Sequence, residues 1–212
     1  MYVQLNGSVY SDGETITQDE IFKNVEKTGK YPTTSAPPPS EFIEFFDRNE
    51  PSIFIEVSGQ LSATIKNALV GKQELGKKDI EIIDSRRISI GYGNVVLQAA
   101  KWRDEGIAFN ELVQKIRDLV TASRGIITIN SLEYLYHGSR YSAIDHFASS
   151  LLKIRPFLNI KPDGTLGVLK KVCGSRNKAV KELFNYFKDQ YLHLKLTISA
   201  SVILTVLRKQ KY

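Results

Sequence analysis

The sequence predicts an α/β protein of two lobes, a parallel-sheet α/β lobe at residues 1–122 and a smaller mixed α/β lobe at residues 123–212. A repeated order of β-rich run, polar loop and helix predicts the first lobe, because this order is typical of parallel sheets. A change of character near Ala122, after which strand and hairpin patterns follow, predicts the second. With 212 residues, 42% of them hydrophobic, the chain can bury a good core in one or two domains.

The N-terminal part is predicted to hold a strand, two helices and a proline-rich loop. Met1–Leu5 reads as the strand, and Thr17-Gln-Asp-Glu20 is a capping-box pattern that starts a helix ending near Lys27. The loop at 31–40 then leads into an apolar helix that begins near Glu41. This helix carries aromatic residues that suit either a core or the wall of a ligand pocket: Phe42, Phe45 and Phe46.

Two strands of the predicted parallel sheet follow, each with a polar loop and a helix behind it. The first is Ser52–Val57, followed by the loop Ser58–Thr64, and the second is Asp79–Ile83, followed by Asp84–Arg87. The second loop opens a helix over about 89–104, whose Gly91 and Gly93 are too few for a dinucleotide fingerprint. Apolar residues at helical spacing predict the last helix of the lobe over 109–120.

The C-terminal lobe is predicted to contain strands, a hairpin and two helices. Gly125–Ile129 reads as a strand, and 142–153 as a helix with a wide apolar face. Lys161-Pro-Asp-Gly164 is a turn sequence, so 157–160 and 165–169 should pair as an antiparallel hairpin. A helix from about Asn177 to Asp189 follows.

Three polar loops precede helices, and together they favour a site for an anionic head group. In the first, Tyr31-Pro-Thr-Thr-Ser-Ala-Pro-Pro-Pro-Ser40, prolines restrict the conformations of three hydroxyl side chains. Loops at the carboxyl ends of parallel strands converge with helix N-termini, where free N–H groups attract anions. The alternative for any one loop is ordinary helix capping by Ser, Thr or Asp.

Five ordered motifs of the chain resemble the DegV family, the fatty-acid-binding proteins that include the B subunits of bacterial fatty acid kinase. They are Pro32-Thr-Thr-Ser-Ala-Pro37, Ser58-Gly-Gln-Leu-Ser-Ala-Thr64, Ile83-Asp-Ser-Arg86 with Gly91-Tyr-Gly93, Ser131-Leu-Glu-Tyr-Leu135, and Leu151-Leu-Lys-Ile-Arg-Pro156. The resemblance covers roughly residues 1–190 and implies a DegV-like two-lobe fold.

The resemblance also implies a function, a site and partners. Such a protein buries a long-chain fatty acid and holds its carboxylate by hydroxyls that match Thr34 and Ser62 here, with Ser35 beside them. The helix at 142–153 would line the acyl chain with Ile144, Phe147 and Leu151. A separate fatty acid kinase subunit would phosphorylate the carboxylate, so the chain itself is expected to be a carrier and not an enzyme.

Departures from the family pattern leave a second interpretation open. The resemblance implies a first strand with an Asp-Ser-Thr loop and a late His-containing loop, and neither occurs in this sequence. The alternative is therefore a truncated or degenerate member without ligand, which acts as an interaction domain or has no function.

Composition and the absence of certain motifs argue against several other classes of function. His137, His146 and His193 lie in no nucleophile elbow, no P-loop occurs, and three separated histidines with one cysteine give no metal-ligand spacing, so we expect neither catalysis nor a metal. A single cysteine and no signal segment lead us to expect a cytoplasmic protein. The net charge of +6 is scattered in pairs, which favours a solvated surface, with transient contact to membrane or kinase, over nucleic-acid binding.

Overall fold

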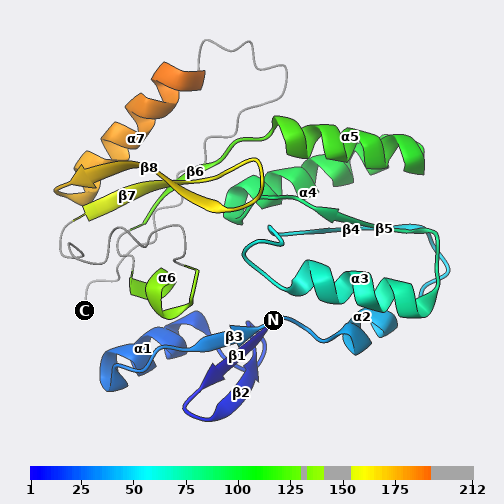
Figure 1. The fold of residues 1–212 in the computed structure, drawn as a ribbon, viewed down its shortest axis with the longest axis horizontal. Coiled ribbons are helices and arrows are strands. Elements are labelled where there is room, and N and C mark those ends of the chain that lie inside the picture. Colours follow the sequence, from blue (N-terminus) through cyan, green and yellow to red (C-terminus); the bar gives the residue numbers. More distant parts are fainter. Residues whose placement is uncertain (130–132, 141–153, 192–212) are drawn as a thin grey trace.

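The computed structural model describes residues 1–129, 133–140 and 154–191, which form three sheets and their helices (Figure 1). The sheets have the strand orders β2-β1-β3, β4-β5 and β6-β7-β8. The strands are β1 (Tyr2–Leu5), β2 (Ser8–Ser11), β3 (Thr33–Ser35), β4 (Ser52–Glu56), β5 (Ile80–Asp84), β6 (Ile126–Thr128), β7 (Ile154–Ile160) and β8 (Leu166–Cys173). The helices are α1 (Gln18–Thr28), α2 (Pro39–Phe46), α3 (Thr64–Leu75), α4 (Ser89–Asp104), α5 (Phe109–Ala122), α6 (Glu133–His137) and α7 (Arg176–Tyr191).

The N-terminal sheet is antiparallel, and α1 follows its first hairpin. β1 and β2 are joined by Asn6-Gly7, a dipeptide typical of hairpin turns, and both residues have positive φ angles, of 52° and 84°. β1 also pairs with β3, with Val3 opposite Thr34. The predicted capping box at Thr17 is confirmed, because the Thr17 hydroxyl accepts from the Glu20 N–H and the Glu20 carboxylate accepts from the Thr17 N–H.

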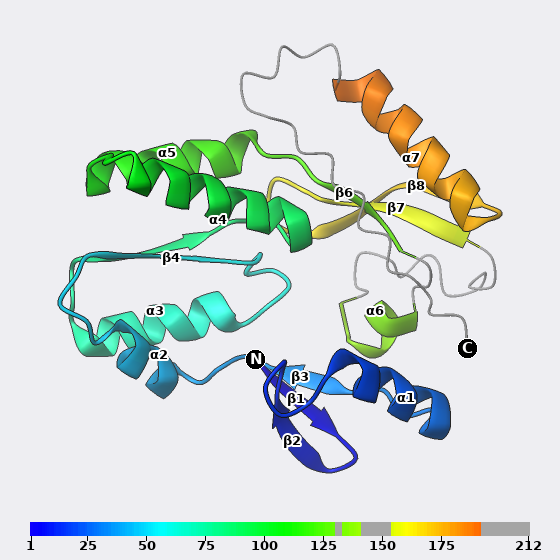
Figure 2. The ribbon, with the colours of Figure 1, turned by 180° about the vertical axis from the view of Figure 1, so that it is seen from behind.

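The parallel pair β4–β5 lies between two layers of helices (Figures 1 and 2). α2 and α3 cover one face, where Phe42, Phe46, Ala68 and Ile80 form a buried cluster. α4 and α5 cover the other face, where the buried cluster consists of Ile83, Val95, Ala99, Leu112, Ile116 and Val120. Both strands carry apolar residues toward both faces because helices cover both faces of the pair.

The hairpin β7–β8 contributes to two cores because β8 carries one extra residue. Leu158 pairs with Val168 while Phe157 pairs with Lys170, which leaves Leu169 outside the ladder. A bulge of this kind changes the direction of side chains along the strand. On one side of it, Leu158, Ile160 and Leu166 pack with residues that include Leu61 and Ile88 of the first lobe. On the other, Phe157 and Val172 pack with Ala179 and Leu183 of α7.

The predicted α/β class, with a parallel sheet and a second lobe built on an antiparallel sheet, is confirmed. Besides the predicted parallel sheet, β1, β2 and β3 form a separate antiparallel sheet that the sequence did not indicate. Part of the predicted loop at 31–40 is a strand, and the next helix begins at Pro39 and not near Glu41, since proline suits the first turn of a helix. The predicted helix at 142–153 and the segment 192–212 lie outside the described residues.

The turn of the β7–β8 hairpin contacts the loops that follow β4 and β5. The Ser58 hydroxyl, which is fully buried, donates to the Gly164 carbonyl at 2.7 Å. Arg86 Nη1 donates to the Pro162 carbonyl at 3.2 Å. The carboxyl ends of the two parallel strands are therefore linked to the second lobe.

The buried side chain of Arg87 makes a second link, at the connection that follows α5. Arg87 is only 3% exposed, and its Nη2 donates to the carbonyls of Val120 and Ser123. Burial, with smaller contributions from Arg124 and Arg86, lowers the pKa of this guanidinium. Because α5 ends at Ala122 and β6 begins at Ile126, we propose that the lobe boundary lies at this connection.

Gly71 permits the close contact between α2 and α3. A Cβ at this position would lie 2.7 Å from the Phe42 Cβ and 2.9 Å from the Pro39 carbonyl oxygen. We expect Gly71→Ala to lower the free energy of unfolding by up to about 2 kcal/mol, because overpacking against α2 costs about 1–3 kcal/mol and the gain in helix propensity offsets about 1 kcal/mol of it. Urea unfolding measures the change in the free energy of unfolding, and Gln73→Ala on the exposed side of α3 serves as the control. A Gly71→Ala variant that is more stable than the unmodified chain would contradict the close contact between α2 and α3.

Candidate head-group site

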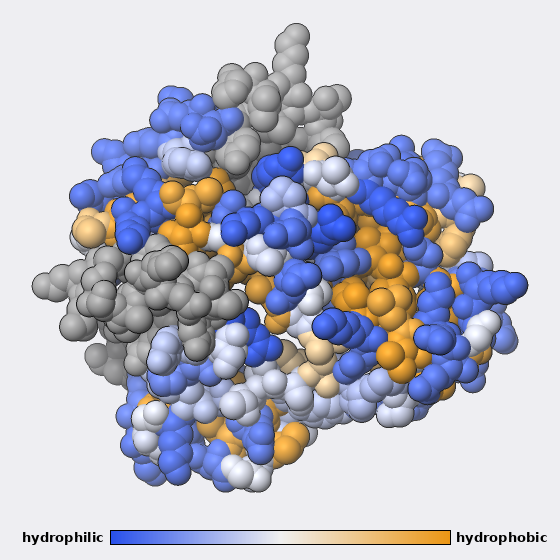
Figure 3. All heavy atoms as spheres, in the orientation of Figure 1, coloured by the Kyte–Doolittle hydropathy of each residue, from blue (hydrophilic) through white to orange (hydrophobic). Residues whose placement is uncertain are grey.

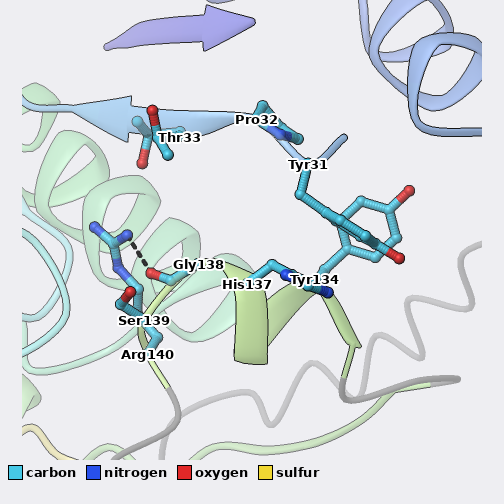
Figure 4. Close-up of a pocket in the computed structure, with 9 residues that line it drawn as sticks. Tyr31, Pro32, Thr33, Tyr134, His137, Gly138, Ser139 and Arg140 are labelled. Carbon is cyan, nitrogen blue, oxygen red and sulfur yellow. Dashed lines mark hydrogen bonds between the residues drawn. The ribbon is translucent and has the colours of Figure 1, made fainter. Parts of the chain in front are cut away.

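A pocket of about 360 Å³ lies between the start of β3 and the segment that contains α6 (Figure 4). This volume falls within the usual range for ligand pockets. No acidic side chain is among the lining residues, whereas an arginine and several hydroxyls are. The residues that line it are Tyr31, Pro32, Thr33, Thr34, Tyr134, His137, Gly138, Ser139 and Arg140.

Backbone turns at the ends of α1 and α6 direct the residues on both sides of the pocket toward it. Gly29 ends α1 in the left-handed conformation, with a φ of 68°, and Tyr31 and Pro32 then lead into β3. On the other wall, Gly138 and Ser139 close α6, and Ser139 has a φ of 58°. The Arg140 N–H donates back to the Leu135 carbonyl at 3.2 Å. This reversal places the Arg140 side chain on the pocket side of α6.

Arg140 is the cationic group of the pocket and also a link to the loop after β4. Its Nη1 donates to the Gly138 carbonyl at 2.6 Å, and its Nε donates to the Leu61 carbonyl at 3.2 Å. Figure 4 shows the guanidinium pointing toward the strand that carries Thr33. A guanidinium has five N–H donors, so three remain for a ligand as far as the described residues are concerned. Paired N–H donors of arginine match the two oxygens of a carboxylate.

Aromatic rings form the other side of the pocket. Tyr31 stacks on His137 with ring centroids 3.9 Å apart, and Tyr134 meets Tyr31 edge-on at 5.0 Å. Phe22 of α1 packs edge-on against Tyr134 at 5.7 Å. His137 thus packs on Tyr31. The pocket combines a cationic, hydroxyl-bearing end with an aromatic wall.

The three predicted head-group residues have different places in the structure. Thr34 lines the pocket. Ser35 ends β3, pairs with Tyr2 and is not among the lining residues. Ser62 does not line the pocket either; its hydroxyl accepts from the Thr64 N–H at 3.2 Å and contacts the Thr64 hydroxyl at 2.8 Å. Ser62 is nevertheless adjacent to Leu61, whose carbonyl binds Arg140.

The expectation that three loops converge at the carboxyl ends of parallel strands was wrong for the first loop. β3 belongs to the antiparallel sheet, and the proline loop after it is joined to α3 by the Asn67 side chain, which donates to the Pro37 carbonyl at 2.7 Å. The loops after β4 and β5 do meet, since the Ser58 N–H donates to the Arg87 carbonyl. They contact the turn that contains Gly164, as described above, so the pocket lies elsewhere.

Arg140, Tyr31, Tyr134 and His137 were missed as site residues by reasoning from the sequence. Their signal was weak but present: the segment Tyr136-His-Gly-Ser-Arg140 directly follows the matched motif that ends at Leu135. The predicted acyl-chain residues Ile144, Phe147 and Leu151 lie outside the described residues.

Residues 1–129, 133–140 and 154–191 contain no group of three or more His, Cys, Asp or Glu side chains placed to hold a metal ion. Within the same ranges, no helix has the length and apolar character required to span a bilayer.

Comparison with known proteins matches residues 1–202 to the family model described as an uncharacterised protein of the DegV family. A DegV domain-containing protein from Caldanaerobacter subterraneus is 34% identical over 191 residues, which cover 88% of this chain and 67% of the relative. The chain therefore spans about two thirds of the length of that relative.

Solved structures share the fold. A DegV family protein from Thermus thermophilus, whose structure is described as showing fatty acid binding, has a TM-score of 0.79 and 29% identity over 89% of this chain and 68% of its own. The Fatty Acid Kinase B3 protein of Streptococcus pneumoniae, loaded with linoleic acid, has a TM-score of 0.80 with 21% identity over the same shares of the two chains.

Proposed function

The chain belongs to the DegV family, and on this basis we propose that it binds a long-chain fatty acid by its carboxylate at the pocket between β3 and α6. The observation that carries the proposal is the Arg140 guanidinium at the same pocket as the Thr34 hydroxyl, opposite an aromatic wall. The relative from Thermus thermophilus, described as binding fatty acid, supports this class of ligand.

The hydrocarbon chain and the carboxylate of the ligand contribute differently to the proposed binding free energy. Each buried methylene contributes about 0.8 kcal/mol, so the acyl chain supplies most of the affinity. A carboxylate taken out of water without partners carries a penalty of several kcal/mol, and the guanidinium and hydroxyls offset it. In this proposal Thr34 and Arg140 contact the carboxylate. Ser35 and Ser62 do not line the pocket, and they remain proposed contacts because they directly follow Thr34 and Leu61, whose carbonyl binds Arg140. Ile144, Phe147 and Leu151 remain the proposed residues along the acyl chain.

A finer proposal concerns the partner. The chain presents the carboxylate to a fatty acid kinase in the cytoplasm, with transient membrane contact, and itself performs no chemistry. The resemblance to B subunits of this kinase motivates it, and the Streptococcus pneumoniae protein supports a shared fold. Incubation with oleate, ATP and a purified kinase subunit should yield acyl phosphate only when the chain is present; acyl phosphate at the same rate without the chain would contradict the proposal.

Calorimetric titration with oleate and with oleyl alcohol tests binding and the role of the head group. The alcohol has the same hydrocarbon and lacks the charge, so we expect the acid to bind more tightly by at least about tenfold. Equal affinity for acid and alcohol would contradict the carboxylate site. No binding of either ligand to a folded chain would favour the alternative of a degenerate member without ligand.

Thr34→Ala and Ser62→Ala are expected to weaken oleate binding while changing stability little. A hydroxyl that hydrogen-bonds a carboxylate contributes about 1 kcal/mol, so each variant should lose about fivefold in affinity. Thr121→Ala removes an exposed hydroxyl on α5 and serves as the control. If the double variant binds oleate as tightly as the unmodified chain, neither hydroxyl belongs to the site.

A further inference from the structure

The two walls of the head-group pocket belong to different cores. The wall that carries Thr34 is part of the N-terminal sheet. The core of that sheet consists of Val3, Leu5 and Ile16, with Tyr10 and Ile21 packed against it. The surface over this sheet and α1, at the bottom of the view in Figure 3, is mostly hydrophilic. The opposite wall contains α6, whose Leu135 packs on the core of the second lobe. The width of the pocket is therefore set by contacts across it and not by one shared core.

A stack of two aromatic rings joins these walls. The rings of Tyr31 and His137 lie nearly parallel, at 12°, with their centroids 3.9 Å apart. Tyr134 of α6 meets Tyr31 edge-on, and Phe22 of α1 meets Tyr134 edge-on, so further rings support the stack. Rings at this separation are in van der Waals contact, and a gap of about 1 Å would already forfeit up to about half of the attraction. The stack therefore holds the two walls at a defined distance.

β3 is held at both of its ends. At its start Tyr31 packs on His137, and at its end Ser35 pairs with Tyr2 of β1. The Tyr2 hydroxyl in turn donates to the Glu41 carboxylate of α2, which joins this end of the sheet to the first lobe. Loss of the stack would therefore release the end of β3 that lies at the pocket and leave the other end in place.

Short ordered segments connect the stack to the polar groups of the pocket. Thr34 lies three positions after Tyr31 and belongs to β3. Arg140 lies three positions after His137, and its N–H donates to the Leu135 carbonyl at the end of α6. A change in the distance between the two rings therefore moves Thr34 and Arg140 relative to each other.

A carboxylate is sensitive to such a change, whereas a hydrocarbon chain is not. Hydrogen bonds weaken steeply outside a narrow range of distance and angle, so a carboxylate that bridges Thr34 and Arg140 loses a contact when the walls separate. The attraction between apolar groups is non-directional and tolerates the same displacement. A change in the width of the pocket should therefore reduce the affinity for an acid more than the affinity for the corresponding alcohol.

We propose that Tyr31 and His137 are positioning residues of the head-group pocket. Their stack holds the Thr34 hydroxyl and the Arg140 guanidinium at the separation that one carboxylate can bridge, and it thereby sets the preference of the pocket for an acid over an alcohol. Figure 4 shows the rings of Tyr31 and His137 on one side of the pocket and the Arg140 guanidinium on the other, so the rings act through the walls and not by contact with the carboxylate. The inference rests on the fatty acid binding proposed above.

The ratio of the affinities for oleate and oleyl alcohol, measured by calorimetric titration, tests the proposal. Tyr31→Ala and His137→Ala should each lower this ratio about fivefold, which corresponds to the loss of one hydrogen bond to the carboxylate. Tyr31→Phe and His137→Phe restore a ring at each position and should recover the ratio. Phe184→Ala removes a ring that is 50% exposed on α7, away from the pocket, and serves as the control.

A double variant tests whether the two residues act through one contact. Tyr31→Ala combined with His137→Ala should lower the ratio no more than either single variant, because both substitutions remove the same stack. His137 is exposed, so its replacement should leave the chain folded, and circular dichroism checks this. His137→Gln, which has a flexible chain in place of the ring, provides the same test if His137→Ala unfolds.

Two outcomes in the variants would overturn the positioning role. An equal fall in the affinities for acid and alcohol would mean that the stack only stabilises the fold. A ratio in His137→Phe as low as that in His137→Ala would mean that the imidazole itself contacts the carboxylate. Either result rejects the positioning role alone, whereas an unmodified chain that shows no preference for oleate over the alcohol rejects the proposed carboxylate site as well.

Discussion

Arg140→Ala is expected to weaken oleate binding about 30-fold, the largest loss from any single side chain that lines the pocket. Hydrogen bonds to charged groups contribute about 1.5–3 kcal/mol, and 2 kcal/mol corresponds to about 30-fold in the dissociation constant. Arg140 is the one cation among the lining residues, and it has donors left after binding the Gly138 and Leu61 carbonyls. Calorimetric titration of the variant with oleate measures the loss.

Two controls separate the head-group contact from a structural effect of Arg140. The affinity for oleyl alcohol should change little in Arg140→Ala, because the alcohol carries no charge to pair. Arg140→Lys retains the charge and loses the paired geometry, so it should recover part of the affinity for oleate. An equal fall in affinity for acid and alcohol would mean that Arg140 supports the loop at Leu61 and does not contact the carboxylate.

Gly164→Ala is expected to lower the free energy of unfolding by about 3 kcal/mol. Gly164 has a φ of 90°, where an L side chain costs about 1–2 kcal/mol. A Cβ at this position would also lie 2.5 Å from the Ser58 Oγ, in a buried contact between the lobes, and overpacking adds about 1–3 kcal/mol. Urea unfolding gives the difference from the unmodified chain.

A variant at a second glycine separates the effect of the contact with Ser58 from the effect of backbone strain. Gly29→Ala also places a Cβ on a residue with positive φ, 68°, but no neighbour lies within 4 Å of that Cβ. The free energy of unfolding of Gly29→Ala should therefore fall only by the part that is due to backbone strain. Adding Ser58→Gly to Gly164→Ala removes the atom that clashes and should recover part of the stability. If Gly164→Ala and Gly29→Ala are equally destabilised, the hairpin turn does not pack on Ser58.

Elements with local chemical signals were predictable from the sequence. The capping box at Thr17 and the turn Lys161-Pro-Asp-Gly164 depend on residues that are neighbours in the chain, and both are confirmed. α5 was recognised by its helical spacing because its buried residues Leu112, Ile116 and Val120 recur every four positions. β3 was mistaken for a loop because it is short and polar, and only pairing with β1 makes it a strand.

The candidate site was predictable only in part, because its two walls come from distant segments. Thr34 was predicted from the hydroxyls of its own loop and from the resemblance; it lines the pocket, and its contact with a head group stays a prediction. Arg140 reaches the Leu61 carbonyl across 79 positions of the chain, and no local pattern predicts that contact. The contact between the loop after β4 and the β7–β8 turn was not predictable for a similar reason, since Gly164 lies 106 positions from the Ser58 hydroxyl that donates to its carbonyl.

Native mass spectrometry of the freshly purified chain tests the central claim of fatty acid binding most directly. We expect one ligand per chain, which denaturing extraction identifies as a long-chain fatty acid, and a lower occupancy in Arg140→Ala. A folded chain that carries no fatty acid, and takes up none when oleate is added in excess, would contradict it.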